Sequence, residues 1–178
     1  ILGAGTNVLA PDEGLREVVI CTKDALTGLC DLGGGKIEAF AGETLSKTAV
    51  FARNLSLTGL EFAHGIPGTV GGGIYMNAGA YGGEMKQAAM ETTVLTMDGE
   101  TRVFAGEAQG FAYRTSAFED LPMIIVKTVF QLAPGDKEEI SARMQELMDK
   151  RRTSQPLELP SAGSTFKRPE GAYAGALI

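Results

Sequence analysis

Three glycine-rich segments carry the residue types that could hold an anionic ligand. The first is Gly3-Ala4-Gly5-Thr6-Asn7, and the others span residues 65–73 and 77–83. Small residues let backbone N–H groups gather around a phosphate, and Thr and Asn side chains add further hydrogen-bond donors. The first segment lacks the GxGxxG spacing of the Rossmann fingerprint and by itself would be read as a tight turn. Three such segments together suit a long ligand with several polar groups.

An arginine and a serine could act on a substrate. Arg114 stands in the largely apolar run 110–118, where a partly buried guanidinium needs a carboxylate or phosphate, or a structural salt bridge. Ser164 lies beside Lys167 in the proline-bracketed segment 155–169. Its hydroxyl either hydrogen-bonds its own turn or faces a substrate.

Other chemistries find little support in these residues. No GxSxG elbow is present, which disfavours a hydrolase nucleophile. The single histidine, His64, has no partner at a metal-ligand spacing, so we expect a loop or packing role and no metal. Cys21 and Cys30 form no CxxC motif and are expected to be free thiols.

The amino-acid composition is typical of a folded protein with a net negative charge. Of 178 residues, 44% are hydrophobic, and 16 Lys and Arg against 22 Asp and Glu give a net charge of −6. That sign disfavours a protein whose surface tracks nucleic acid. No run approaches the roughly 18 apolar residues of a membrane span, so no membrane insertion is expected.

The first half of the chain predicts strands and one helix that would position these segments. Residues 17–20 and 36–40 read as short strands, with a hairpin turn at 33–35. A helix is predicted after Thr44 as N-cap, with an apolar face and an end at Gly59. Residues 60–85 have little periodicity, and their backbone amides must find partners elsewhere.

The second half predicts a hairpin, a strand and a longer helix. Strands at 92–97 and 101–104 flank the Asp98-Gly99 turn signal, and 123–132 reads as a mostly buried strand. From Asp136 the period changes to 3.6, with Glu139 completing a capping-box-like start. The apolar stripe of this helix consists of Ile140, Met144, Leu147 and Met148.

Taken together, five segments resemble the UDP-N-acetylenolpyruvoylglucosamine reductase (MurB) family. The resemblance covers almost the whole chain, and its second and fifth segments are the most specific. In order, they are residues 3–9; 65–73 with 76–82; Tyr113-Arg114-Thr115-Ser116; Arg151-Arg152 with Gln155-Pro156-Leu157; and residues 161–169.

The resemblance implies a non-Rossmann α+β FAD-binding domain, its latter part, at residues 1–132, followed by the start of an α+β substrate-binding domain at 133–178. It implies a fragment that lacks both ends, with a catalytic glutamate expected beyond residue 178. FAD would be noncovalent, since no histidine occurs in residues 1–10. The cofactor-binding residues would be Gly3, Ala4, Gly5, Thr6, Asn7, Pro67, Gly68, Thr69, Gly71, Gly72 and Gly79.

The implied reaction belongs to peptidoglycan synthesis and takes place in the cytoplasm. NADPH reduces FAD, and a hydride then adds to the enolpyruvyl ether of a UDP-linked amino sugar. Arg114 would bind the carboxylate and stabilise the charge that develops there, while Ser164 would donate the proton. Tyr113 and Lys167 would join them in binding the substrate, and Lys167 would either orient Ser164 or bind a substrate phosphate.

Two other readings stay open at this point. One is an FAD-dependent oxidase on the same scaffold, which would return electrons to oxygen. The other is a nonenzymatic nucleotide-binding module, for which Ser164 would be dispensable. The oligomeric state is not indicated by the sequence.

Overall fold

The centre of the fold is an antiparallel five-stranded sheet with the strand order β1-β2-β8-β6-β7. A computed structural model describes residues 1–155, 157–159, 166, 169, 171–172 and 174–177 of this chain. The α+β class expected from the sequence is confirmed. The sheet strands are β1 (Leu29–Gly33), β2 (Lys36–Phe40), β6 (Ala89–Thr96), β7 (Thr101–Ala105) and β8 (Met123–Gln131).

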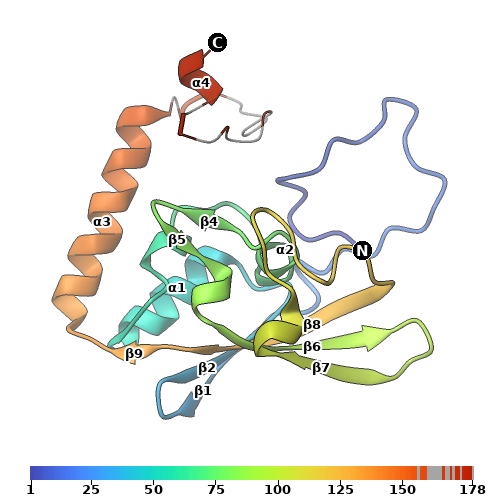
Figure 1. Ribbon diagram of the computed structural model, residues 1–178, viewed down its shortest axis with the longest axis horizontal. Helices are drawn as coiled ribbons and strands as arrows, with labels where there is room; N and C mark the ends of the chain where they lie inside the picture. Colours follow the sequence, from blue (N-terminus) through green and yellow to red (C-terminus); the bar gives the residue numbers. More distant parts are fainter. Residues whose placement is uncertain (156, 160–165, 167–168, 170, 173, 178) are drawn as a thin grey trace.

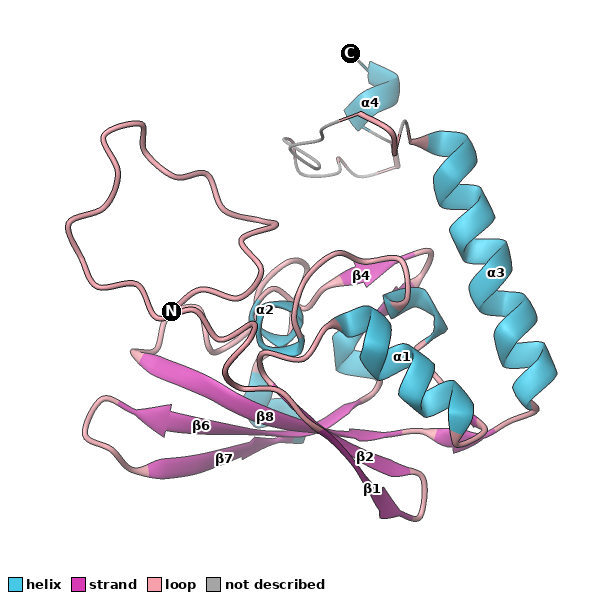
Figure 2. Ribbon diagram, turned by 180° about the vertical axis from the view of Figure 1, so that it is seen from behind, coloured by secondary structure: helices cyan, strands magenta, loops and turns pink. Residues whose placement is uncertain are grey.

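The helices α1 (Leu45–Asn54) and α2 (Val70–Tyr75) lie with short strands over one face of this sheet, and α3 (Lys137–Ser154) stands to one side of it (Figures 1 and 2). The helix α2 contacts β8 and β2, and α1 packs beside α2. The α-helices are α1 (Leu45–Asn54), α2 (Val70–Tyr75), α3 (Lys137–Ser154) and α4 (Ala174–Leu177). Two-residue strands form the pairs β3 (Leu57–Thr58) with β9 (Ala133–Pro134) and β4 (Gly79–Ala80) with β5 (Gly83–Glu84). Single turns of 3₁₀ helix are η1 (Glu61–Ala63), η2 (Met85–Gln87) and η3 (Gly106–Gln109).

The predicted hairpins are confirmed, because each depends on local turn chemistry. Gly33, Gly34 and Gly35 all have positive φ between β1 and β2. Gly99 has φ +83° between β6 and β7, and its N–H donates to the Thr96 carbonyl. The predicted strand at 123–132 corresponds to β8, which inserts between β2 and β6.

The first helix begins where the sequence predicts and ends earlier. Thr44 is the N-cap of α1, and its side chain accepts a hydrogen bond from the Lys47 N–H. The helix ends at Asn54 and not at Gly59, because Ser56 adopts φ +56° and turns the chain into β3. The left-handed residue that usually ends a helix is here a serine, which the sequence does not mark.

The long helix α3 packs its predicted apolar stripe into the main core. Ile140, Met144 and Leu147 are buried in the same cluster as residues of the sheet and α1. The pairing of β9 with β3 brings the chain back to this core just before α3 begins. The start of a second domain at residue 133 stays a prediction.

The N-cap of α3 gives a test of stability away from the ligand segments. The Asp136 carboxylate accepts a hydrogen bond from the Glu139 N–H at 2.9 Å. We expect Asp136→Ala to lower the free energy of unfolding by about 1 kcal/mol, because one N–H at the helix start loses its partner. Asp136→Asn keeps an acceptor and should lose less. Urea unfolding of both variants measures the difference, and equal losses would contradict the cap assignment.

The predicted strand at residues 17–20 is wrong. Its residues belong to a long excursion of the first 25 residues away from the sheet (Figure 1), and Val18 is 92% exposed. The backbone pairing here is an isolated parallel bridge between Leu2 and Cys21. A β-branched run becomes a strand only beside another strand, and the described chain offers none at this place.

A buried polar network fixes the pairing of β6 within the sheet. Gln109, at the end of η3, is fully buried; its amide donates to the carbonyls of Ala89 and Met90 and accepts from the Thr92 hydroxyl. The register of β6 on β8 shifts between Ala89 and Glu91. Gln109 therefore satisfies carbonyl groups at the point where the strand ladder is irregular.

Candidate functional site

The structure brings two of the three glycine-rich segments together. The Thr6 hydroxyl donates to the Pro67 carbonyl at 3.0 Å, across 61 residues of sequence. Gly3 packs against Thr69 so closely that a Cβ atom at position 3 would lie 2.5 Å from the Thr69 hydroxyl oxygen. A Cβ at Gly68 would lie 3.4 Å from the Thr6 hydroxyl oxygen. Residues 3–7 and 67–69 therefore form one surface, called here the glycine clasp.

The glycine clasp presents backbone donors with no acceptor of their own. Within the described part of the chain, the N–H groups of Gly3, Ala4, Gly5, Thr6 and Asn7 donate to no protein acceptor, and neither do those of Gly68 and Thr69. Gly5 has φ +69°, and no atom lies within 4 Å of where its Cβ would stand. This donor set has the chemistry that a pyrophosphate requires.

The glycines that follow the clasp have structural partners. The Gly71 N–H donates to the Ala41 carbonyl, and a Cβ at Gly71 would lie 2.9 Å from that of Ala41. The Gly72 N–H donates to the Thr69 hydroxyl, the N-cap of α2. A Cβ at Gly79 would lie 2.6 Å from the Gly83 carbonyl oxygen. Close packing is thus sufficient to explain Gly71 and Gly79, and a role for them in cofactor binding stays a prediction.

Arg114 differs from the expectation that it is partly buried. Both Arg114 and Tyr113 are exposed, with Tyr113 at 56%, and the guanidinium lies 5.9 Å from the centre of the Tyr113 ring. Among the described residues Arg114 has no carboxylate partner, so the structural salt bridge does not form there. The apolar neighbours suggested burial, but the chain reverses direction at Tyr113 and Arg114, which places both residues at the tip of a turn. Arg114 is therefore free to bind an external anion.

The turn that carries Arg114 is tight and strained. Ala112 and Thr115 pair across it in an isolated antiparallel bridge, which leaves Tyr113 and Arg114 as its two central residues. Arg114 has φ +59°, a conformation that costs a non-glycine residue about 1–3 kcal/mol and persists only where the surroundings impose it. The direction of the Arg114 side chain is thus set by what holds this turn.

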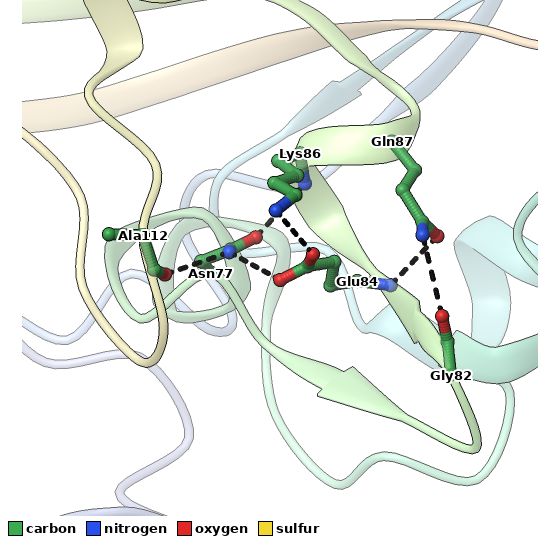
Figure 3. Close-up of polar contacts among 6 residues, drawn as sticks. All are labelled: Asn77, Gly82, Glu84, Lys86, Gln87 and Ala112. Carbon is green, nitrogen blue, oxygen red and sulfur yellow. Dashed lines mark hydrogen bonds and ion pairs between the residues drawn. The ribbon is translucent and has the colours of Figure 1, made fainter.

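Two polar side chains next to α2 are placed to hold the turn. Asn77 is buried, and its amide donates to the Ala112 carbonyl at 2.9 Å and to the Glu84 carboxylate at 2.8 Å, as Figure 3 shows. Beyond Arg114, the buried Ser116 hydroxyl donates to the Tyr75 carbonyl at 2.8 Å. Asn77 and Ser116 lie in the segments 77–83 and 113–116 that the sequence singles out, but neither was predicted to hold a turn. Their roles carry no local signal, because each partner is more than 30 residues away.

Two predicted substrate residues, Ser164 and Lys167, lie outside the described residues. Of the predicted substrate-binding residues, Tyr113 and Arg114 are thus the ones that the structure describes.

His64 has the structural role expected for it. It caps η1, and its Nδ1 hydrogen-bonds the Ser46 hydroxyl at 3.2 Å. The thiols of Cys21 and Cys30 are free.

The rest of the described chain shows no second group of candidate functional residues. Its residues contain no group of three or more His, Cys, Asp or Glu side chains that could hold a metal ion. No helix within the described ranges has the length and apolar character to cross a membrane. Hydrogen bonds from Lys150 and Arg143 lower the pKa of Glu146, but these residues form an exposed ion-pair cluster on α3. An open hollow in the N-terminal excursion is lined by Leu9, Ala10, Pro11 and Asp12, none of them a candidate site residue.

The fold is of the α+β class, and its glycine clasp presents backbone donors of the kind that bind phosphate groups. Residues 1–105 match the family described as FAD binding domain, and the chain belongs to that family. Family membership assigns FAD as the cofactor, and the donor set of the clasp fits a dinucleotide pyrophosphate. The match includes both segments of the clasp and ends at the last residue of β7.

The chain is also similar over its whole length to enzymes named UDP-N-acetylenolpyruvoylglucosamine reductase. It is 44% identical to the one from Limosilactobacillus reuteri, matching 100% of this chain and 59% of that protein. It is 46% identical to the one from Shouchella clausii, matching 57% of that protein. The crystal structure of MurB from Thermus caldophilus superposes with a TM-score of 0.82 at 38% identity, covering 99% of this chain and 64% of that one. The chain thus spans about three fifths of the length of these curated relatives.

Proposed function

We propose that the glycine clasp holds FAD noncovalently. Its backbone N–H groups at residues 3–7 and 68–69 would bind the pyrophosphate, with the Thr6 and Asn7 side chains as neighbouring donors. The free donors and the family match at residues 1–105 support this placement. The same proposal gives Pro67 the role of joining the two segments, and Gly71, Gly72 and Gly79 that of letting the backbone pack closely beside them.

The protein that contains this chain would use FAD to reduce UDP-N-acetylglucosamine enolpyruvate to UDP-N-acetylmuramate, with NADPH as hydride donor. This places it in peptidoglycan synthesis in the cytoplasm. The observation that carries the proposal is an exposed arginine with no carboxylate partner among the described residues, held on a strained turn that is anchored beside α2. This anchor is at the C-terminal end of α2. The N-cap of the same helix is Thr69, in the glycine clasp, and a six-residue helix is about 9 Å long. A cofactor site and an anion-binding side chain thus flank one short helix.

The chain's own residues would supply charge and protons for this reduction. Once reduced by NADPH, bound FAD would supply the hydride that adds to the β-carbon of the enolpyruvyl double bond. The electron pair of that double bond then moves toward the α-carbon and the carboxylate, where the Arg114 fork neutralises it through two parallel hydrogen bonds. Tyr113 would contact the same substrate, because its ring lies beside the guanidinium. The Ser164 hydroxyl delivers a proton to the α-carbon, and Lys167 either orients that hydroxyl or binds a substrate phosphate.

A half-reaction assay on the full-length protein tests this function. The bound flavin is reduced without oxygen, then mixed with UDP-N-acetylglucosamine enolpyruvate, and flavin absorbance is followed with time. Rapid reoxidation is the expected result. Flavin that stays reduced until oxygen enters would instead favour an oxidase, and protein without flavin would favour a nucleotide-binding module.

The tight contact inside the glycine clasp predicts how flavin binding can be lost. In Gly3→Ala the new Cβ would lie 2.5 Å from the Thr69 hydroxyl oxygen, which is itself bonded to the Gly72 N–H. Residues 3–7 must then move away from 67–69, and we expect the FAD content of purified protein to fall severalfold. In the double variant Gly3→Ala with Thr69→Ala the clashing oxygen is gone and the next Thr69 atom lies 3.6 Å away. The ratio of flavin to protein absorbance measures all three variants. The double variant should hold as much flavin as Thr69→Ala alone, and a further loss as large as the one that Gly3→Ala causes in the unmodified protein would contradict the steric account.

A further inference from the structure

We propose that Asn77 is a positioning residue for Arg114, acting through the carbonyl of Ala112. The inference rests on the proposed function, in which Arg114 binds the substrate carboxylate, but its geometric part can be tested separately. The Asn77 side chain hydrogen-bonds neither the Arg114 side chain nor the glycine clasp. It holds the turn on which Arg114 stands.

The Asn77 amide is fully used and its orientation is fixed. Its nitrogen donates to two acceptors, the Ala112 carbonyl and a Glu84 carboxylate oxygen, while its oxygen accepts the Lys86 N–H at 3.0 Å (Figure 3). A flipped amide would face two acceptors with its oxygen, so the network leaves one orientation. Lys86 also forms an ion pair with Glu84 at 2.7 Å, which holds the carboxylate in place. With 2% of its surface exposed, Asn77 cannot exchange these partners for water without a local rearrangement.

The bond to Ala112 bears directly on the conformation of Arg114. The Ala112 carbonyl also accepts the Thr115 N–H across the turn, at a longer 3.4 Å. The shorter bond from Asn77 thus strengthens a weakly closed turn whose second central residue has positive φ. Ser116 fixes the other side through the Tyr75 carbonyl. Both anchors lie at the C-terminal end of α2, so the helix that starts in the clasp also positions the arginine.

Two replacements separate the amide donor from the backbone conformation. Asn77 has φ +43°, which glycine tolerates. Asn77→Gly therefore keeps the chain path and removes the whole amide, both its donor and its acceptor. Asn77→Asp keeps the shape and the oxygen that accepts the Lys86 N–H, but it places a second oxygen in front of the Ala112 and Glu84 acceptors. Gln87→Ala is the matched control: Gln87 bonds the Glu84 N–H and the Gly82 carbonyl in the same hairpin, yet does not contact the Arg114 turn (Figure 3).

Limited trypsin digestion of the full-length protein reports on the turn without reference to activity. Trypsin cuts after arginine, and the Arg114–Thr115 bond is protected while the turn is closed. Loss of the Asn77 hydrogen bond to the Ala112 carbonyl should raise cleavage at this bond roughly fivefold to tenfold in Asn77→Gly, measured by mass spectrometry of the fragments. Gln87→Ala should leave this rate unchanged. Equal cleavage in Asn77→Gly and the unmodified protein would overturn the inference whatever the enzyme does.

A double-mutant cycle with Arg114 tests the functional part. Asn77→Gly should slow flavin reoxidation by the enolpyruvyl substrate roughly tenfold, with flavin reduction by NADPH unchanged. In an Arg114→Ala background the same replacement should have little further effect, because Asn77 acts through that side chain. Additive effects, or equal slowing of both half-reactions, would overturn the positioning role.

If Arg114→Ala itself has no effect on reoxidation, the proposed function fails while the trypsin result still decides whether Asn77 holds the turn. Asn77→Asp is measured in the same way, and Asn77→Gly carries the test if the aspartate variant does not fold.

Discussion

Arg114→Ala is expected to slow the reoxidation of reduced flavin by UDP-N-acetylglucosamine enolpyruvate by about 10²–10³-fold, the typical cost of removing a preorganised group that stabilises developing charge. The physical reason is the negative charge that collects on the substrate carboxylate after hydride addition. The change should leave the fold intact, since Arg114 is exposed and forms no ion pair within the described residues. Anaerobic stopped-flow absorbance of the flavin measures the rate.

Arg114→Lys is the matched variant for this prediction. Lysine keeps the positive charge but presents a single ammonium in place of a planar fork, so recovery should be partial. Reduction of the flavin by NADPH should be unchanged in both variants, because Arg114 is assigned to the sugar substrate alone. Full activity in Arg114→Ala, or equal slowing of flavin reduction, would show that this arginine does not bind the carboxylate.

Ser164→Ala is expected to slow the same reoxidation step by about 10²–10⁴-fold, the usual contribution of a positioned general acid. A serine hydroxyl is a weak acid, so its value depends on being held next to a strongly basic carbon. Reduction of the flavin by NADPH should again proceed at the unmodified rate. The two half-reactions are measured separately by flavin absorbance.

An isotope readout separates proton donation from simple binding in this variant. In deuterated water the unmodified protein should place one solvent deuterium on the α-carbon of the product. If Ser164 donates that proton, the alanine variant should show slower incorporation at saturating substrate. A variant with a raised KM but an unchanged maximal rate would assign Ser164 to binding and not to proton transfer.

The elements predicted best were those whose causes are local. Thr44 and Asp136 cap their helices because each side chain reaches an N–H three residues ahead. The hairpins at 33–35 and 98–99 follow from glycines that adopt positive φ. By contrast, α2 was not predicted, because Gly71, Gly72 and Gly73 have low helix propensity. Its stability comes from packing: a Cβ at Gly71 would meet Ala41 and one at Gly73 would meet Leu45.

The sequence indicates the residue types of the candidate site but not its geometry. The sequence marks residues 3–7 and 65–73 as donor-rich, but their contact through Thr6 and Pro67 spans 61 positions and depends on the whole fold. Arg114 was expected to be partly buried because its neighbours are apolar, whereas the turn exposes it. The anchor from Asn77 to Ala112 joins residues 35 apart, a distance at which composition and periodicity carry no information.

The order of strands in the sheet has a consequence for synthesis on the ribosome. The strand β8 lies between β2 and β6, so the hairpins β1–β2 and β6–β7 can each form early but cannot join until β8 has been made. After Phe40 completes β2, synthesis up to Gln131 takes on the order of 5–20 s at about 5–20 residues per second. The edge of β2 stays unpaired throughout that interval, and the edge of β6 stays unpaired from the completion of β7 at Ala105 until β8 is made. Such edges are templates for pairing with other chains. For several seconds, therefore, nascent chains of this protein that are crowded on a polysome can aggregate through these edges. This risk ends only when β8, the last strand of the sheet to be made, has been synthesised.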